Sequence, residues 1–319
     1  MGKGDRLRWM RSPCPSNYSL KRTITKIVTL MNETSSVITV PSLDETVMTP
    51  SPKGKAYIVH LPPPLHPHQS THKKGTTMIN ILYLYPDLLN LYGDHANVSA
   101  LEKYLEARGV KVNIDRADTD APIDFSKYHM IYVGSGTENA IDRALALLTP
   151  YREQIKDFVE DGKMLLATGT ATELFGKCID TERDSTQALG VLGYGAKRDK
   201  NRRILQDCLF ESSLFEKKTL GFVNRCSDFY DTDNSLFTVS FGVGYDKKSK
   251  NEGFVYKNFM ATTLIGPLLV RNPHVTKYVA DRLFEISGDK PSRDADTELV
   301  EKAYNAALVE LEKRANSKK

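Results

Sequence analysis

Apolar and polar residues follow regular strand and helix periods from Met78 onward. Residues 79–85 form an apolar run of strand length that ends at Pro86, and residues 96–108 have helical spacing before Gly109. The same patterns, bounded by turn residues, predict further strands at 110–114, 129–133 and 164–168 and helices at 138–148 and 151–161.

This alternation of strands and helices predicts an α/β fold with a doubly wound, mostly parallel sheet flanked by helices. Ligands of such sheets bind at the carboxyl ends of the strands, and Gly134-Ser135-Gly136 follows one of these ends. Residues 204–263 show β-type alternation, which predicts an extension of the sheet or a hairpin layer. Two helices, at 276–287 and 297–315, close the chain.

Residues 1–77 differ in amino-acid composition from the rest of the chain. They are rich in Ser, Thr and Pro and include Leu61-Pro62-Pro63-Pro64, so we expect a disordered extension ahead of a domain at 78–319. The alternative is that Met78 is the natural start, and that translation from further upstream adds residues 1–77. Four histidines lie close together in this extension but fit no metal-ligand spacing, which favours a solvated segment: His60, His66, His68 and His72.

Charge and cysteine content narrow the classes of function. The extension has 11 Lys and Arg against 4 Asp and Glu, whereas residues 78–319 have 33 against 36, so the predicted domain lacks the basic surface typical of nucleic-acid binding. The scattered cysteines Cys14, Cys178, Cys208 and Cys226 predict neither a metal site nor a disulfide framework. We expect no cofactor. The sequence has no apolar run of about 18 residues and no signal-peptide pattern, which predicts a cytoplasmic protein.

Several short motifs, in order, carry a family resemblance. The sequence has Leu88 to Asp94 (LLNLYGD), Tyr132 to Gly136 (YVGSG), Leu174 to Lys177 (LFGK), Gly253 to Asn258 (GFVYKN) and Leu264 to Pro267 (LIGP). Together they resemble class I glutamine amidotransferases of the cobyric acid synthase type, and most closely the glutaminase subunit of lipid II isoglutaminyl synthase. The resemblance runs from about Met78 to the C-terminal helix.

The resemblance implies hydrolysis of glutamine by a cysteine on a strand-to-helix elbow, with a histidine base and backbone N–H groups that stabilise an oxyanion. Here the nucleophile position holds Gly169, followed by Thr170, Ala171 and, at the family's glutamine, Glu173. The base position holds Ile265, and Asp228 replaces an arginine that the resemblance implies to hold substrate. Gly134, Ser135 and Gly136 keep the loop that in the family supplies an oxyanion-hole amide, although a turn after a strand requires glycine as well.

Other residues are poor substitutes for the missing pair. Thr168 and Thr170 flank the elbow, but a threonine needs an adjacent base to become nucleophilic. Cys178 and Cys226 are of a type more often buried in packing, and His129 lies in a predicted core strand. We expect His95 and His274 at the surface.

Three hypotheses follow. The first is a catalytically degenerate glutaminase-like subunit, kept as a binding or regulatory partner of a Mur-ligase-like synthetase in cell-wall precursor amidation. The second is an active glutaminase with relocated catalytic residues. The third is a small-ligand sensor that uses the vacated pocket, which Gly169 and Ile265 make roomier and less polar. Glutamine or another small amino acid is a candidate ligand of the chain, and nucleotides would be tested beside amino acids.

Overall fold

We describe the fold from a computed structural model, which describes residues 47–50, 56–59, 78–117 and 121–317. Within residues 16–75, a unit separate in its contacts, strands β1 (Val47–Pro50) and β2 (Ala56–Val59) pair antiparallel. The sequence predicts no element there. The rest of the extension lies outside the described residues, so its disorder and the boundary at Met78 stay predictions.

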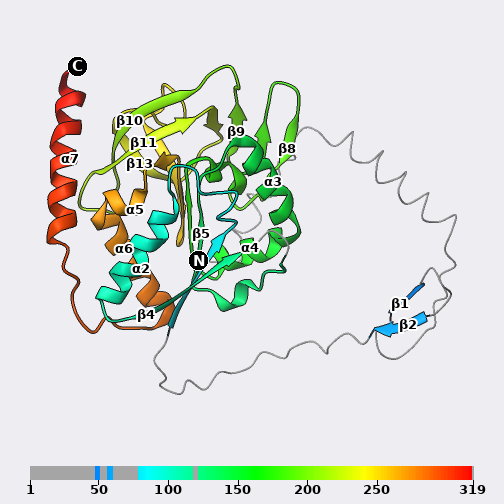
Figure 1. The fold of residues 1–319 in the computed structure, drawn as a ribbon. Coiled ribbons are helices and arrows are strands. Elements are labelled where there is room, and N and C mark those ends of the chain that lie inside the picture. Colours follow the sequence, from blue (N-terminus) through cyan, green and yellow to red (C-terminus); the bar gives the residue numbers. More distant parts are fainter. Residues whose placement is uncertain (1–46, 51–55, 60–77, 118–120, 318–319) are drawn as a thin grey trace, which may run out of the picture. The chain divides into compact units, whose positions relative to one another are not determined.

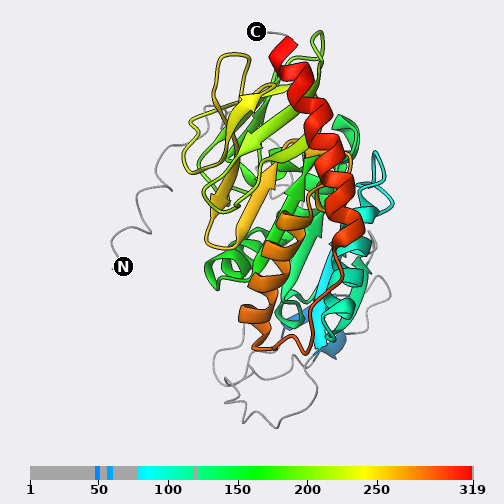
Figure 2. The ribbon, with the colours of Figure 1, turned by 90° about the vertical axis from the view of Figure 1, so that its left-hand side faces the viewer.

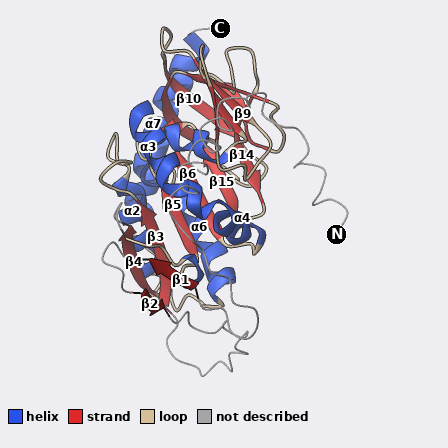
Figure 3. Cartoon of the chain, turned by 90° about the vertical axis from the view of Figure 1, so that its right-hand side faces the viewer, coloured by secondary structure: helices blue, strands red, loops and turns tan. Residues whose placement is uncertain are grey.

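A ten-stranded sheet forms the centre of the larger of the two units (Figure 3). Its order is β16-β11-β10-β13-β14-β15-β6-β5-β3-β4. The strands of this sheet are β3 (Met78–Leu84), β4 (Lys111–Ala117), β5 (Met130–Val133), β6 (Met164–Thr168), β10 (Ile204–Glu211), β11 (Thr219–Arg225), β13 (Ser235–Phe241), β14 (Asn251–Tyr256), β15 (Phe259–Thr262) and β16 (Leu264–Ile265). Strands β15, β6, β5, β3 and β4 pair in parallel, and the other pairs are antiparallel.

The predicted α/β, doubly wound class is confirmed, because helices cover both faces of this sheet (Figure 1). The α-helices are α2 (His95–Ala107), α3 (Glu138–Leu148), α4 (Arg152–Glu160), α5 (Leu268–Arg271), α6 (Pro273–Ser287) and α7 (Glu298–Ser317). Short 3-10 helices lie at η2 (Phe125–Lys127), η3 (Thr149–Tyr151) and η4 (Gly169–Phe175). None of the described helices is both long and apolar enough to cross a bilayer.

Alternation along the strands sends successive side chains to opposite faces. In β3, Leu82 packs in the cluster that includes Ile141 of α3 and Phe158 of α4, whereas Ile81 packs in the cluster that includes Leu101 of α2 and Val279 of α6. Both faces of the parallel half are therefore buried, as its near-continuous apolar strands require.

Two additions complete the domain. A four-stranded sheet has the order β12-β9-β7-β8, with β7 (Cys178–Asp180), β8 (Ser185–Gln187), β9 (Gly195–Arg198) and β12 (Ser227–Tyr230). Helix α7 lies along the outside of the domain (Figure 2), where Tyr304 and Leu311 pack on Leu209 of β10 and Leu220 of β11.

The parallel register brings distant segments to one edge of the sheet. Thr262 at the end of β15 pairs with Thr168 at the end of β6, so the residues after β15 reach the same edge as Gly169. Val133 of β5 pairs with Ala167, which places Gly134-Ser135-Gly136 beside that edge too. The three predicted site segments converge for this topological reason.

Candidate functional site

Gly169 forms a sharp elbow between β6 and the helix η4. Its φ is +62°, a left-handed conformation that glycine adopts without the steric cost paid by other residues. A strand-to-helix elbow of this kind presents a nucleophile in hydrolytic enzymes. The backbone of the elbow is present here without a reactive side chain.

The space beside Gly169 is filled. A Cβ built on Gly169 would lie 2.6 Å from Cβ of Ser135 and 2.7 Å from Cγ2 of Ile265. The structure thus brings together the predicted nucleophile, loop and base positions. The expectation of a roomier cavity at this point is wrong, because Ser135 and Ile265 pack into the volume that a cysteine side chain would need.

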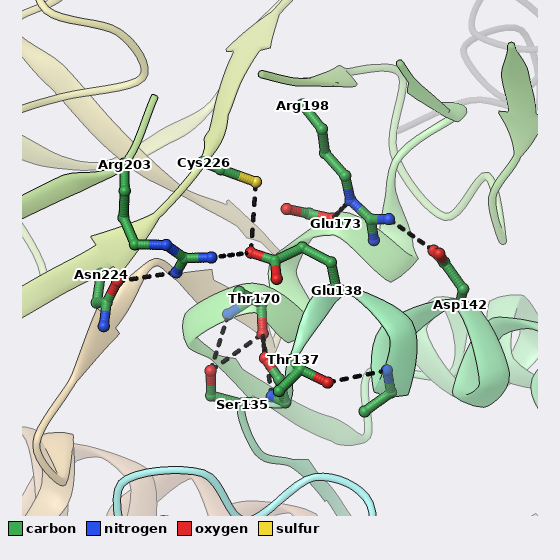
Figure 4. A network of polar contacts seen from close by, with 12 residues as sticks. Ser135, Thr137, Glu138, Asp142, Thr170, Glu173, Arg198, Arg203, Asn224 and Cys226 are labelled. Atoms are coloured by element: carbon green, nitrogen blue, oxygen red, sulfur yellow. Dashed lines mark hydrogen bonds and ion pairs between the residues drawn. The ribbon is translucent and has the colours of Figure 1, made fainter. Parts of the chain in front are cut away.

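Two N–H groups beside the elbow are already hydrogen-bonded (Figure 4). The N–H of Thr170 donates to Oγ of Ser135 at 3.2 Å, and the N–H of Gly136 donates to Oγ1 of Thr170 at 3.0 Å. The Thr170 hydroxyl donates in turn to the carbonyl oxygen of Gly136 at 2.7 Å. Stabilisation of an oxyanion requires donors that point at the reacting group, and here side chains of the protein accept both.

Asp94 holds the loop at residues 134–136 through a hydrogen bond to its backbone. Its Oδ2 accepts the N–H of Ser135 at 2.5 Å, and the N–H of Leu91 donates to the carbonyl oxygen of Ser135 at 2.9 Å. Asp94 is fully buried, and this burial raises its pKa to about 7 against the opposing effect of the Ser135 N–H. A Cβ on Gly134 would clash with the carbonyl oxygen of Leu89, so close packing of this loop is one reason for its glycines.

The position that resembles the family's glutamine holds a buried ion pair. Oε2 of Glu173 lies 2.6 Å from Nε of Arg198, and Nη1 of Arg198 lies 2.7 Å from Asp142. Burial raises the pKa of Glu173, and the Arg198 charge opposes that rise. Glu173 therefore fixes η4 to β9 and α3 from inside the protein.

Asp228 is also engaged by neighbouring arginines. Its Oδ2 lies 2.5 Å from Nη2 of Arg202, and its Oδ1 lies 3.5 Å from Nη1 of Arg225. It is not among the residues that line the pocket described next. The structure therefore does not place Asp228 with Gly169, Ser135 and Ile265.

A pocket of about 320 Å³ opens beside the elbow. Its lining residues are Leu91, Tyr92, Gly136, Thr137, Glu138, Thr170, Arg203 and Asn224. Sequence reasoning missed Glu138 and Arg203, which form an ion pair of 2.6 Å in the wall. A charged residue two positions after the Gly134–Gly136 loop was a signal for Glu138, whereas nothing in the spacing pointed to Arg203.

The candidate substitute residues have structural partners. Oγ1 of Thr168 and the phenol of Tyr132 are 2.8 Å apart, and Cys178 lies in β7 against the Tyr230 hydroxyl. Cys226 lies near the pocket, where burial and then the Glu138 carboxylate raise its thiol pKa to about 12. Such a thiol stays protonated at neutral pH and is a weak nucleophile.

The histidines have ordinary explanations as well. Nδ1 of His129 accepts the N–H of Asn80 at 3.0 Å, and His95 is exposed as predicted. The prediction for His274 is wrong: it is partly buried between the rings of Phe215 and Tyr304, and burial lowers its pKa to about 4.

Comparison with known proteins shows the family of the chain. The model of the CobB/CobQ-like glutamine amidotransferase domain matches residues 80–273. The chain belongs to this family. A relative is the subunit GatD of the glutamine-hydrolyzing lipid II isoglutaminyl synthase of Staphylococcus aureus, 29% identical over 211 residues that cover 66% of this chain and 86% of GatD. The Streptococcus pneumoniae GatD is 26% identical over 200 residues, covering 62% and 77%.

Solved structures include similar chains. A glutamine amidotransferase of Thermotoga maritima is 16% identical with a TM-score of 0.42, covering 74% of this chain and 97% of that one. The glutaminase domain of Trypanosoma brucei CTPS, solved with bound acivicin, is 11% identical with a TM-score of 0.41 and coverages of 68% and 98%. The chain is thus a member of the CobB/CobQ-like family, and the assignment of Gly169 and Ile265 to the nucleophile and base positions stays a prediction.

Proposed function

We propose that this chain is a glutaminase-like subunit of the lipid II isoglutaminyl synthase type that has lost glutamine hydrolysis. It acts in the cytoplasm as a binding or regulatory partner of a Mur-ligase-like synthetase in cell-wall precursor amidation. The similarity to two GatD subunits supports the type. The observation that carries the loss of chemistry is the elbow residue Gly169, whose missing side chain is replaced in space by Ser135 and Ile265.

The elbow lacks the nucleophile, the general base and the free N–H donors that amide hydrolysis requires. Gly169 offers no thiol to attack a carbonyl, and Ile265 offers a hydrocarbon where a proton acceptor is needed. The N–H groups of Thr170 and Gly136 are taken by Ser135 Oγ and Thr170 Oγ1. Loss of nucleophile and base lowers an enzyme's rate by orders of magnitude, and a closed oxyanion site removes the residual stabilisation.

The environment of Cys226, whose thiol lies beside the pocket, argues against glutamine hydrolysis by a relocated nucleophile. Cys226 donates a hydrogen bond to Oε1 of Glu138 at 3.3 Å, and Arg203 also binds that oxygen. Because the carboxylate is engaged by a guanidinium, it is a poor base for the thiol, whose pKa of about 12 keeps it protonated.

Ammonia release tests the loss of hydrolysis. The full chain, alone and with the Mur-ligase-like synthetase of the same genome, is incubated with glutamine and compared with S. aureus GatD treated in the same way. We expect no glutamine-dependent ammonia above the level without protein. A rate that disappears on mutation of one side chain, for example Cys226→Ser, contradicts the proposal.

Co-purification tests the partner role. Residues 78–319, which we propose as the folded domain, serve as bait for the same synthetase, and the full chain is run beside them. We expect both to retain the synthetase. Failure of both to do so overturns the partner role and leaves the result of the ammonia assay unaffected.

A further inference from the structure

Strand β4 leaves one edge of the ten-stranded sheet open. It is the last strand in the sheet order and, among the residues that the structure describes, it pairs with β3 alone (Figure 3). The segment after α6 contacts the backbone ahead of β4, where Ser292 and Arg293 bind carbonyl oxygens of residues 106–108. An open edge presents backbone N–H and C=O groups that a further strand can pair with.

The backbone groups at this open edge belong to alternate residues of β4. The N–H of Tyr85 donates to the carbonyl oxygen of Ala117, so the polar backbone groups of Ala117 point toward β3. Because these groups alternate between the two sides of a strand, those of Arg116, Ile114 and Val112 point away from β3. Each of these three residues therefore offers one N–H and one C=O group to a strand outside the sheet.

The usual protections of a strand edge are absent from β4. Exposed edges are commonly blunted by proline, by a bulge or by short length. β4 has seven residues without proline, and its register with β3 runs unbroken from Lys111 to Ala117. The strand at the opposite edge of the sheet, β16, has two residues and offers far less backbone. β4 is thus the edge of this sheet that is suited to accept another strand.

The sequence of β4 is complementary to itself when two copies run antiparallel about Ile114. Outward-pointing residues then meet each other, with Ile114 opposite Ile114 and Val112 opposite Arg116, and each such pair exchanges two backbone hydrogen bonds. Registers centred on Val112 or on Arg116 are disfavoured, because they set Arg116 opposite Arg108 or opposite Arg116 of the other copy. Charge and backbone direction together select the register about Ile114.

The other face of β4 is complementary in charge in the same register. Asn113 lies opposite Asp115 of the other copy, where the side-chain amide can donate to the carboxylate, as it does within one chain at 3.1 Å. The exposed Lys111 lies opposite Ala117 and diagonal to Asp115. Opposite charges are therefore neighbours across the two-fold axis, and no two like charges face each other directly.

We propose that two copies of this chain associate through β4, antiparallel and centred on Ile114, so that their two sheets continue as one. This inference goes beyond the proposed function and holds whether or not glutamine is hydrolysed. β4 contributes no lining residue to the pocket beside Gly169, and β3 and β5 separate it from β6. Each copy therefore keeps its elbow clear of the joined edge, and the pair can hold two synthetase molecules.

Sedimentation velocity on the full chain over a series of protein concentrations tests the association. We expect a monomer–dimer equilibrium with a dissociation constant on the order of 10 µM, because one strand pair buries less area than a standard interface. The weight-average sedimentation coefficient should rise with concentration toward that of a dimer. A single monomeric species at about tenfold above this concentration, or a stoichiometry other than two, overturns the proposal.

Two substitutions of the exposed Arg116 test the role of the edge backbone. Arg116→Pro removes an outward N–H and leaves the pairing with β3 intact, because the N–H of Arg116 does not point toward β3. Arg116→Ala is the matched control, since it keeps that N–H. Arg116→Pro should weaken the dimer at least about tenfold more than Arg116→Ala does. Equal effects of the two substitutions overturn the proposal.

Two substitutions of Asn113 test the register. In the proposed pairing residue 113 faces Asp115 of the other copy, so Asn113→Asp sets like charges opposite each other and Asn113→Lys sets opposite charges. At low ionic strength the Asn113→Lys dimer should be at least about tenfold tighter than the Asn113→Asp dimer, because the contact occurs twice across the two-fold axis. Equal dissociation constants, or the reverse order, overturn the register centred on Ile114.

Two further measurements separate self-association from folding and from other partners. Circular dichroism checks each variant, and if Arg116→Pro does not fold, the two Asn113 variants decide. The Arg116→Pro chain also serves as bait for the synthetase. A monomeric wild-type chain whose synthetase binding is lost in Arg116→Pro would assign the edge to the synthetase and overturn the pairing of two copies. A monomeric chain that binds the synthetase and releases no ammonia contradicts this inference alone.

Discussion

Gly169 combines two demands that no other residue type meets together. Its φ of +62° disfavours side chains, and its surroundings leave no volume for a Cβ. Restoring a cysteine at this position therefore requires more than one substitution, since the side chains of Ser135 and Ile265 occupy the space that the cysteine needs.

We predict that Gly169→Ala lowers the free energy of unfolding by about 2–5 kcal/mol, from left-handed strain of about 1–2 kcal/mol and overpacking of about 1–3 kcal/mol. The control is Gly162→Ala, whose φ of +76° is similar but which has no atom within 4 Å of the added Cβ. Urea denaturation should show a clearly smaller loss for Gly162→Ala. Equal losses would mean that packing around Gly169 contributes nothing.

Asp94 gives the loop at 134–136 a dependence on pH. Because burial raises its pKa in the folded state from an ordinary value of about 4 to about 7, the folded state favours the protonated form. Its contribution to stability is therefore fully present below pH 4 and is lost as the pH rises through 7.

We predict that Asp94→Asn, which keeps an acceptor for the Ser135 N–H but cannot ionise, removes this loss. Between pH 5 and 8 the wild-type chain should lose about 2–3 kcal/mol more of its unfolding free energy than the variant. Urea denaturation at both pH values measures this difference. The control is Asp124→Asn, because the exposed Asp124 accepts from Ser126 and has a lowered pKa, so its effect lies below pH 5. Parallel pH profiles for wild type and Asp94→Asn would contradict the prediction.

Helix α7 is held to the sheet by a narrow apolar contact. Tyr304 and Leu311 are its buried residues, and they meet Leu209 and Leu220 on β10 and β11. Surface ion pairs such as Lys218 with Glu312 contribute little by comparison.

Substitution of Leu311 by alanine should thus cost about 2–4 kcal/mol of unfolding free energy, since Leu311 is 6% exposed. Leu299 in the same helix is 79% exposed, so Leu299→Ala should change stability by no more than about 0.5 kcal/mol. Chemical denaturation of the two variants side by side decides this, and similar values for both would show that α7 does not pack as described.

Hydrophobic periodicity was sufficient to locate the elements of the parallel half. The strand predicted at 164–168 matches β6, and the helix predicted at 138–148 matches α3. The prediction for 204–263 gave β-structure without its pairing. Which strand neighbours which depends on contacts between distant residues, so the antiparallel continuation of the sheet and the separate β7–β9 and β12 sheet were not readable from local pattern.

The site residues also divide into those that local sequence motifs predicted and those that depend on contacts between distant segments. The order of short motifs led to Gly169, Ile265 and Ser135, and the fold brings these three together. Glu138 and Arg203 were missed because their meeting depends on the approach of α3 to the segment before β10. His274 was placed at the surface because nothing local in the sequence indicates that Phe215 and Tyr304 enclose it.

The whole chain combines parts of opposite charge, with an excess of basic residues in 1–77 and of acidic residues in 78–319. Every strand of the ten-stranded sheet, and each residue of its three apolar clusters, lies at or after Met78. Among the residues that the structure describes, the apolar clusters of the domain include none before Met78, and the domain boundary predicted there is open to test.

We predict that residues 78–319 unfold within about 3 °C of the full chain, since removal of contacts worth less than 1 kcal/mol shifts the midpoint by only a few degrees in a domain of this size. Melting followed by circular dichroism measures both. The control is a chain that begins at residue 86 and lacks β3, which pairs with both β4 and β5 in the buried centre of the sheet. That chain should not fold, because removal of β3 leaves β4 without a partner and exposes the apolar faces of α2 and α3. A fall of 10 °C or more in the 78–319 protein would place part of the stabilising packing before Met78 and would move the domain boundary upstream.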